Sequence, residues 1–148
     1  MFSKLKLFCL LIYAVLLLPV VADDNLKTVL PIKMSNTDLA GDMFKRPDMR
    51  PQTHVDGHKT ESVTSMISSD GKYYSGIYRS EATRIDITER PYGVNEFMYF
   101  LSGSVTLTSI DGSVMTIHAG EAVTLPKEWK GIFETDGYEK IWVIYSDE

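Results

Sequence analysis

Three residues with metal-binding side chains alternate in the first half of the chain: His54, Asp56 and His58. On an extended segment all three would face one side, where imidazole and carboxylate groups suit a transition-metal ion. The Asp56-Gly57 pair is also a turn signal, however, and a turn would scatter the three groups. We therefore favour a solvated loop and keep a metal site at these residues as the weaker alternative.

Aromatic residues offer a different chemistry. Tyr73, Tyr74 and Tyr78 lie in one expected strand, and aromatic walls with a few polar tips are typical of small-molecule pockets. Aromatic side chains also fill hydrophobic cores, so both interpretations stay open. We find no arrangement of serine, cysteine and histidine that suggests a nucleophilic triad, and no glycine-rich phosphate loop.

The elements that position these residues are expected to be strands. From residue 62 onward, short apolar runs alternate with turn signals about every 8–12 residues, which is typical of an all-β domain. We expect strands at residues 62–67, 73–79, 83–88, 96–101, 104–110, 114–118, 122–125, 131–135 and 140–145. A closed or sandwiched β-barrel over residues 62–148 would remove most strand edges. Residues 23–61 are expected to form an extended arm, with one or two short strands around residues 28–34.

Two of the expected strands, residues 96–101 and 141–145, are apolar on both faces. A strand that lines a barrel buries one face only, so something else must cover the other face. The arm or a second subunit could do so, and we expect a homodimer.

The first 22 residues read as an export signal. Lys4 and Lys6 precede a charge-free run over residues 7–21, and Ala22 ends the segment before two acids. Cleavage would leave 126 residues with 13 basic and 20 acidic side chains, and would remove the single cysteine, Cys9. This acidic balance, with no basic cluster, argues against nucleic acid and against a membrane surface as partners. The mature protein is therefore expected in the periplasm or outside the cell.

Two spacings then point to a family. Glu96 and Gly103 are separated as in the motif G-x5-H-x-H-x3/4-E-x6-G, and Gly120 and Pro126 as in G-x5-P-x-G-x2-H-x3-N. The chain therefore resembles the cupin superfamily, whose two motifs lie on facing strands of a jelly-roll barrel. Further phrases, such as those at residues 75–78 and 131–134, resemble the ureidoglycine aminohydrolase-type (cupin 3-like) domains. That resemblance implies a Mn-dependent hydrolase of a small nitrogen-rich acid.

The resemblance breaks at the metal ligands. Cupins that bind a metal use two histidines and a glutamate from the first motif and a histidine from the second. This chain has Arg90 and Tyr92 at the first two positions, or Glu89 and Pro91 with the longer spacing, and Gly131 at the last. Only the glutamate is retained, and one carboxylate does not hold a divalent ion well. We therefore expect no cofactor and no standard metal centre, with a divalent metal such as Mn as the minority alternative.

The family geometry implies that Glu96 points into the barrel. It would then be either a functional acid or the structural partner of Arg84 or Arg90. Tyr92 would either bind a polar ligand or fill the space of the lost histidine. The candidate ligand-binding residues are therefore Glu96, Tyr92, Arg90, Tyr78 and Trp129.

Three functions remain open at this point. The first is an exported binding module for a small polar metabolite, held in the barrel without a standard metal centre. The second is a ureidoglycine aminohydrolase-like hydrolase, and the third is a structural or dimerisation module. The sequence does not decide whether the protein is an enzyme.

Overall fold

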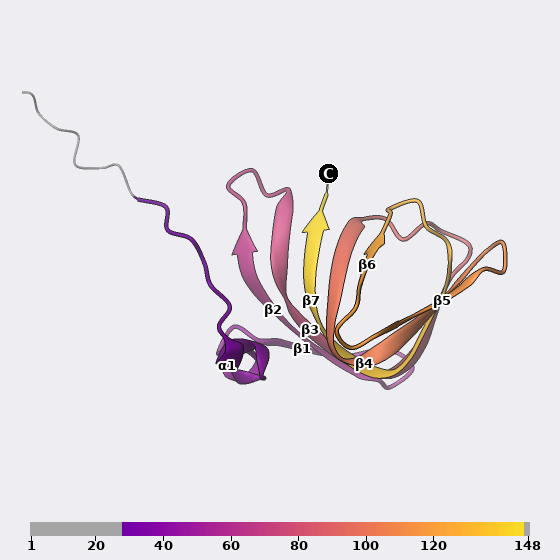
Figure 1. Cartoon of the computed structure of the whole chain (residues 1–148), viewed down its shortest axis with the longest axis horizontal. Helices are drawn as coiled ribbons and strands as arrows, with labels where there is room; N and C mark the ends of the chain where they lie inside the picture. The colour runs from indigo at the N-terminus through magenta and orange to yellow at the C-terminus, as the bar shows by residue number, and fades with distance from the viewer. Residues whose placement is uncertain (1–27, 147–148) are drawn as a thin grey trace, which may run out of the picture. The chain divides into compact units, whose positions relative to one another are not determined.

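The computed structural model of the chain describes residues 28–146 (Figure 1). The expected export signal lies outside these residues. From Pro31 onward the chain forms one compact unit, and the described residues before it are exposed and without regular structure. Its elements are α1 (Asn36–Leu39), the 3-10 helix η1 (Asp42–Lys45), β1 (Arg50–Thr53), β2 (Lys59–Ile67), β3 (Tyr73–Ile87), β4 (Asn95–Ser109), β5 (Val114–His118), β6 (Ala122–Leu125) and β7 (Gly131–Tyr145).

The strands form one antiparallel sheet in the order β1-β2-β3-β7-β4-β5, and β6 pairs with the first half of β4. The all-β class is therefore confirmed. The long strands β3, β7 and β4 bend so that the sheet curls around an interior (Figure 1). The expected barrel is wrong in one respect: within the described residues the sheet does not close, because β1 at one edge and β5 at the other do not pair with each other.

Three strands are also longer than expected, since β3, β4 and β7 have 15 residues each. The sequence pattern suggested a turn at Ser102-Gly103, but this pair lies inside β4, where the register against β7 shifts. Gly103 has a φ of 71°, and an added Cβ there would lie 2.0 Å from the carbonyl oxygen of Gly137. Only glycine permits this close approach, so the apparent turn signal marks a bulge that bends a continuous strand.

The arm differs from its expected form. Residues 28–34 contain no strand, and the arm instead contains α1, η1 and β1. Ser35 caps α1, because its side chain accepts a hydrogen bond from the backbone N–H of Asp38. Because β1 pairs with β2, the sheet begins at Arg50, inside the segment assigned to the arm. No helix in the described part of the chain is long and apolar enough to cross a membrane.

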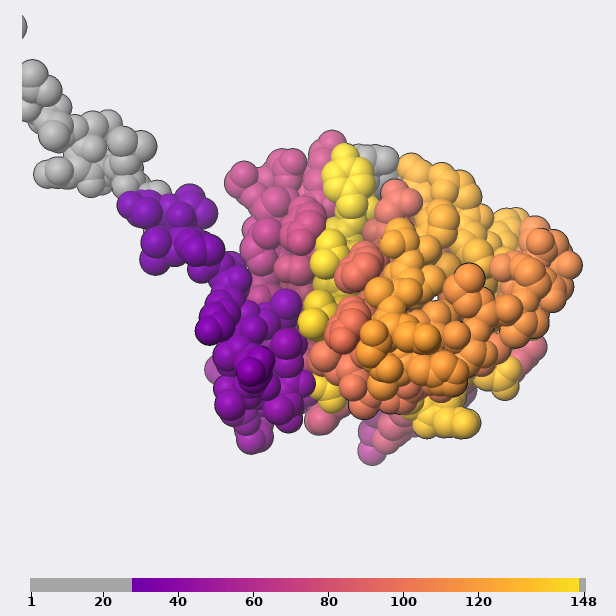
Figure 2. All heavy atoms as spheres, viewed as in Figure 1, coloured from indigo at the N-terminus to yellow at the C-terminus, as the bar shows by residue number. Residues whose placement is uncertain are grey.

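The arm covers part of the outer face of the sheet. Met43 and Phe44 from η1 pack against Val63 and Ile77, and all four side chains are buried. Figure 2 shows the indigo atoms of the arm against the neighbouring strands. Burial of each side chain contributes about 1.5–3 kcal/mol to folding. Of the two strands expected to be apolar on both faces, only Leu101 of β4 packs against this cluster, and Phe97 and Tyr99 stay exposed.

Candidate functional site

The candidate site lies on the inner face of β4 and β7. In this antiparallel pair Met98 is opposite Trp142, and Phe100 is opposite Lys140. Since opposed residues share a face, every second side chain of each strand turns inward. The inward side chains of Glu96 on β4 and of Lys140 and Trp142 on β7 border a cavity of about 320 Å³. It is lined by Ser62, Tyr78, Tyr92, Glu96, Tyr138, Lys140, Trp142 and Ile144.

A buried ion pair forms the centre of this cavity wall. Lys140 Nζ donates a hydrogen bond to Glu96 Oε1 at 2.7 Å, and the two side chains are 6% and 5% exposed. The second carboxylate oxygen of Glu96 accepts a hydrogen bond from the hydroxyl of Tyr92. Both carboxylate oxygens of Glu96 therefore have hydrogen-bond partners. The positive charge of Lys140 balances the negative charge of Glu96 inside the protein.

Soft and aromatic groups surround the rest of the Lys140 ammonium. Its Nζ lies 3.0 Å from Met98 Sδ, and 5.5 Å and 5.6 Å from the ring centroids of Tyr78 and Tyr138. Electron-rich ring faces attract a cation at such distances. Burial nevertheless lowers the pKa of Lys140, and the charge of Glu96 opposes this shift. The neutral amine is thus easier to form here than in water.

The phenols around the cavity stay protonated. Burial raises the pKa of Tyr92, and the neighbouring charge of Glu96 raises it further. Burial also raises the pKa of Tyr138 and, together with a nearby Glu96 charge, that of Tyr78. At neutral pH these residues are therefore hydrogen-bond donors rather than anions.

Trp142 carries an unused donor. Its indole lines the cavity, and its Nε1–H is the one buried side-chain N or O in the described chain without a hydrogen-bond partner. A buried unsatisfied donor costs about 1–3 kcal/mol. Gly76 on β3 makes room for the ring, because an added Cβ would lie 2.8 Å from Trp142 Cζ2.

The structure brings together three of the five candidate residues. Tyr78, Tyr92 and Glu96 line the cavity. Trp129 lies outside the lining and packs edge-on against Tyr92, with ring centroids 6.5 Å apart. Arg90 is exposed and borders a different surface hollow.

The sequence predicted Arg84 or Arg90 as the structural partner of Glu96, and this prediction was wrong. Neither Arg84 nor Arg90 pairs with it, because Lys140 takes that place from 44 residues further along the chain. Lys140, Tyr138 and Trp142 were not among the residues that the sequence pattern predicted for the site. A signal was present, since residues 138, 140 and 142 share one face of a strand by alternation, and a lysine between two aromatics on that face is unusual.

The residues at the cupin ligand positions do not fit the standard metal centre. Arg90 is exposed, Tyr92 is bonded to Glu96, and Glu96 is neutralised by Lys140. At Gly131 an added Cβ would lie 2.2 Å from the carbonyl oxygen of Thr108, so no side chain fits there. Within residues 28–146 no group of three potential ligands is placed to hold a metal. We therefore derive no chemistry through a metal ion.

The loop of His54, Asp56 and His58 forms the expected turn, in which the His54 backbone N–H donates to the His58 carbonyl at 2.9 Å. The turn does not scatter the three groups, however. The two imidazole rings stack with centroids 4.0 Å apart, and Asp56 pairs with His58 Nδ1. His54 Nε2 lies 3.0 Å from the hydroxyl of Thr60. His54 Nε2 and His58 Nδ1 therefore have partners, but the His58 side chain is only 9% exposed, so this histidine is not solvated as the sequence predicted.

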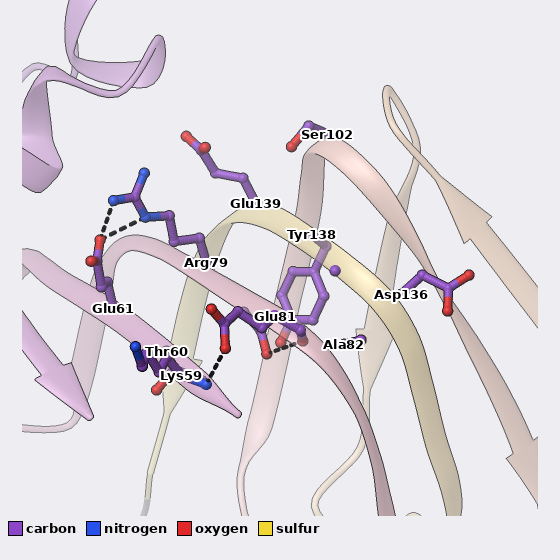
Figure 3. Close-up of a pocket in the computed structure, with 12 residues that line it drawn as sticks. Lys59, Thr60, Glu61, Arg79, Glu81, Ala82, Ser102, Asp136, Tyr138 and Glu139 are labelled. Atoms are coloured by element: carbon purple, nitrogen blue, oxygen red, sulfur yellow. Dashed lines mark hydrogen bonds and ion pairs between the residues drawn. The ribbon is translucent and has the colours of Figure 1, made fainter. Parts of the chain in front are cut away.

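A second hollow, of about 540 Å³, lies where β2, β3 and β7 bend (Figure 3). Arg79 pairs there with Glu61, and its guanidinium lies 4.3 Å from the ring centroid of Phe44. The backbone N–H of Lys59 donates to Glu81 at 2.9 Å. Arg79 and Glu61 thus neutralise each other near solvent, so we place the candidate site at the first cavity.

Comparisons with known proteins agree with the fold. Residues 69–140 match the family model of the EutQ-like cupin domain, so this segment is similar to that family. No curated protein matches the chain significantly.

Several solved structures are similar to this chain in fold. A protein of unknown function from Pseudomonas syringae pv. tomato is 17% identical with a TM-score of 0.58, over 65% of this chain and 43% of that one. The EutQ protein of Clostridium difficile is 20% identical with a TM-score of 0.52, over 68% and 78%. Ectoine synthase from P. lautus is 13% identical with a TM-score of 0.53, over 70% and 72%. The chain thus spans less than half of the Pseudomonas protein, and these identities show the fold alone.

Proposed function

We propose that the protein binds a small polar metabolite in the cavity beside Glu96 and Lys140, without a standard cupin metal centre. The observation that carries this proposal is the buried Glu96–Lys140 ion pair on the wall of an open cavity. In this arrangement the ammonium neutralises the carboxylate that a metal ion would neutralise in a metal-binding cupin.

The size and polarity of the cavity support this proposal. About 320 Å³ lies at the lower end of the range of about 300–1,000 Å³ for ligand sites. Its walls are aromatic, with a few polar groups at their tips, which is typical of small-molecule pockets. The protonated phenols that line the cavity favour a ligand that carries an acceptor such as a carboxylate or carbonyl oxygen.

We further propose that the protein is exported and forms a homodimer. Residues 1–22 would direct export, so that the mature protein acts in the periplasm or outside the cell. The mature protein would also form a homodimer through the part of the outer face that the arm leaves exposed, where Phe97 is 42% and Tyr99 37% exposed. Terminal sequencing of the protein made in cells would test the cleavage after Ala22.

Trp142 provides a direct test of binding. The chain has two tryptophans, so Trp129→Phe leaves Trp142 as the sole indole fluorophore. Acetate, lactate, pyruvate and glycerol would be titrated into this variant. We expect a saturable change in Trp142 emission with at least one of the carboxylates.

Two matched variants make this test specific. Ser62→Phe would fill the cavity and abolish the change, whereas Ser102→Phe, in the second hollow, would leave it intact. The proposal fails if no probe gives a saturable change or if the change survives Ser62→Phe. Ammonia release from ureidoglycine would instead support the hydrolase.

A further inference from the structure

We propose that Lys140 is a covalent binding residue, whose amine condenses reversibly with the carbonyl carbon of a small aldehyde or 2-oxo acid in the cavity. This inference rests on the proposed function, because it concerns the same cavity. It adds the substrate class and the bond that is formed.

The position of Lys140 distinguishes it from the other lysines. It projects from the middle of β7 onto the cavity, whereas the described lysines elsewhere are exposed or only half-buried. Lys45, for example, has a side chain that is 79% exposed. A lysine in a desolvated pocket loses the hydration that keeps its amine protonated, and this is how amine nucleophiles are activated in proteins. The lowered pKa of Lys140 agrees with this placement.

Glu96 is placed to move the protons that condensation requires. Its Oε1 lies 2.7 Å from Lys140 Nζ, within reach of direct proton transfer. Transfer from the ammonium to the carboxylate gives a neutral amine and a neutral acid. The amine nitrogen then attacks the carbonyl carbon, and the electron pair of the C=O bond moves to oxygen.

The remaining steps return both residues to their starting charges. Glu96 protonates the developing alkoxide and takes a proton from the nitrogen, which gives a neutral carbinolamine. It then protonates the hydroxyl, which leaves as water, while the nitrogen lone pair forms the C=N bond. The products are a Lys140 iminium, one water molecule and the Glu96 carboxylate, so the ion pair is kept and no oxidant or reductant is needed.

The surroundings suit the iminium and a small substrate. The faces of Tyr78 and Tyr138, which now contact the ammonium, would contact the iminium cation. The Tyr92 hydroxyl keeps its hydrogen bond to Glu96 and orients the carboxylate.

Reductive trapping tests this inference. The purified protein would be incubated with sodium cyanoborohydride and either propanal or pyruvate, then digested and mapped by mass spectrometry. We expect the reduced adduct on Lys140 to form on the order of tenfold faster than on any exposed lysine, because the cavity binds the carbonyl compound next to the amine. Labelling with both probes indicates recognition of the carbonyl group alone, and labelling with pyruvate alone indicates an oxo acid.

Two lysine variants test whether the adduct forms on Lys140. Lys140→Arg keeps the positive charge and would lose the adduct, whereas Lys59→Arg on the exposed part of β2 would keep it. If Lys140→Arg does not fold, the wild-type peptide map still decides. The inference is overturned if neither probe labels Lys140 above the exposed lysines. Saturable binding without this adduct would refute the inference and leave the proposed function standing, and loss of both would refute both.

Discussion

Lys140 Nζ lies 2.7 Å from Glu96 Oε1 on the inner face of the sheet, although the two residues are 44 positions apart in the chain. Two groups that are each costly to bury neutralise one another beside a cavity. The hydroxyl of Tyr92 binds the second oxygen of the same carboxylate. This small network is the feature on which the account of the molecule rests.

Glu96→Gln should destabilise the protein strongly. The variant leaves the ammonium of Lys140 buried without a counter-charge, and breaking a buried pair in this way costs about 3–5 kcal/mol. Equilibrium urea unfolding of the variant and the wild type would measure the loss. Glu61→Gln is the control, because its partner Arg79 is 48% exposed and such pairs contribute at most about 1 kcal/mol. Equal losses in the two variants would contradict our view of the buried pair.

Gly131→Ala should destabilise the protein even though it adds a single methyl group. The new Cβ would lie 2.2 Å from the carbonyl oxygen of Thr108, so the two strands would have to separate. We expect a loss of about 1–3 kcal/mol in urea unfolding. Glu134→Ala, at an exposed position of the same strand, should change stability by less than about 0.5 kcal/mol. A fully stable Gly131→Ala would show that a side chain fits at this ligand position after all.

Stability should fall as the pH rises above 10. Free tyrosine has a pKa of 10.0, and the folded state raises the pKa of Tyr78, Tyr92 and Tyr138. The folded protein therefore holds more protons than the unfolded chain above pH 10, so alkali favours unfolding. The lowered pKa of Lys140 has the opposite effect, so it makes stability rise with pH. This effect is confined to pH values below the pKa of 10.5 that lysine has in the unfolded chain.

Urea unfolding at a series of pH values above 10.5 would isolate this effect of the tyrosines. Tyr138→Phe removes one of the three phenols and should give a shallower decline. A decline unchanged by this substitution would mean that Tyr138 ionises as easily in the folded state as in the unfolded chain.

The exposed aromatics of the outer face should hold two copies of the chain together. Sedimentation of the wild type is expected to show a dimer, and Phe97→Glu with Tyr99→Glu should give a folded monomer, because charges at the contact oppose association. Ile110→Glu is the control, since Ile110 is 69% exposed and lies beyond the end of β4. A wild-type monomer at all concentrations would contradict the homodimer.

The sequence predicted the fold better than the site. Alternation located most of the strands, and the spacings around Glu96 and Gly120 identified the cupin resemblance, because both signals are local. Ser102-Gly103 misled because the same residues form turns and bulges, and only the pairing of β4 with β7 tells the two apart.

The partner of Glu96 could not be predicted in the same way. It depends on the register between β4 and β7, which places Phe100 opposite Lys140. Sequence proximity instead suggested Arg90, which the loop before β4 leaves exposed. Tyr92, in the same segment, turns inward because its backbone N–H donates to Trp129 and its hydroxyl to Glu96. The local sequence pattern alone does not tell that Tyr92 points inward while Arg90 stays exposed.

The most direct test of the account is the metal content of the protein, measured by mass spectrometry after purification without chelators and without a histidine tag. We predict less than stoichiometric transition metal in a folded protein, with no change in stability when Mn is added, because Lys140 already neutralises Glu96. A stoichiometric metal ion that is lost in Glu96→Gln would contradict the account and give priority to a metal-dependent hydrolase.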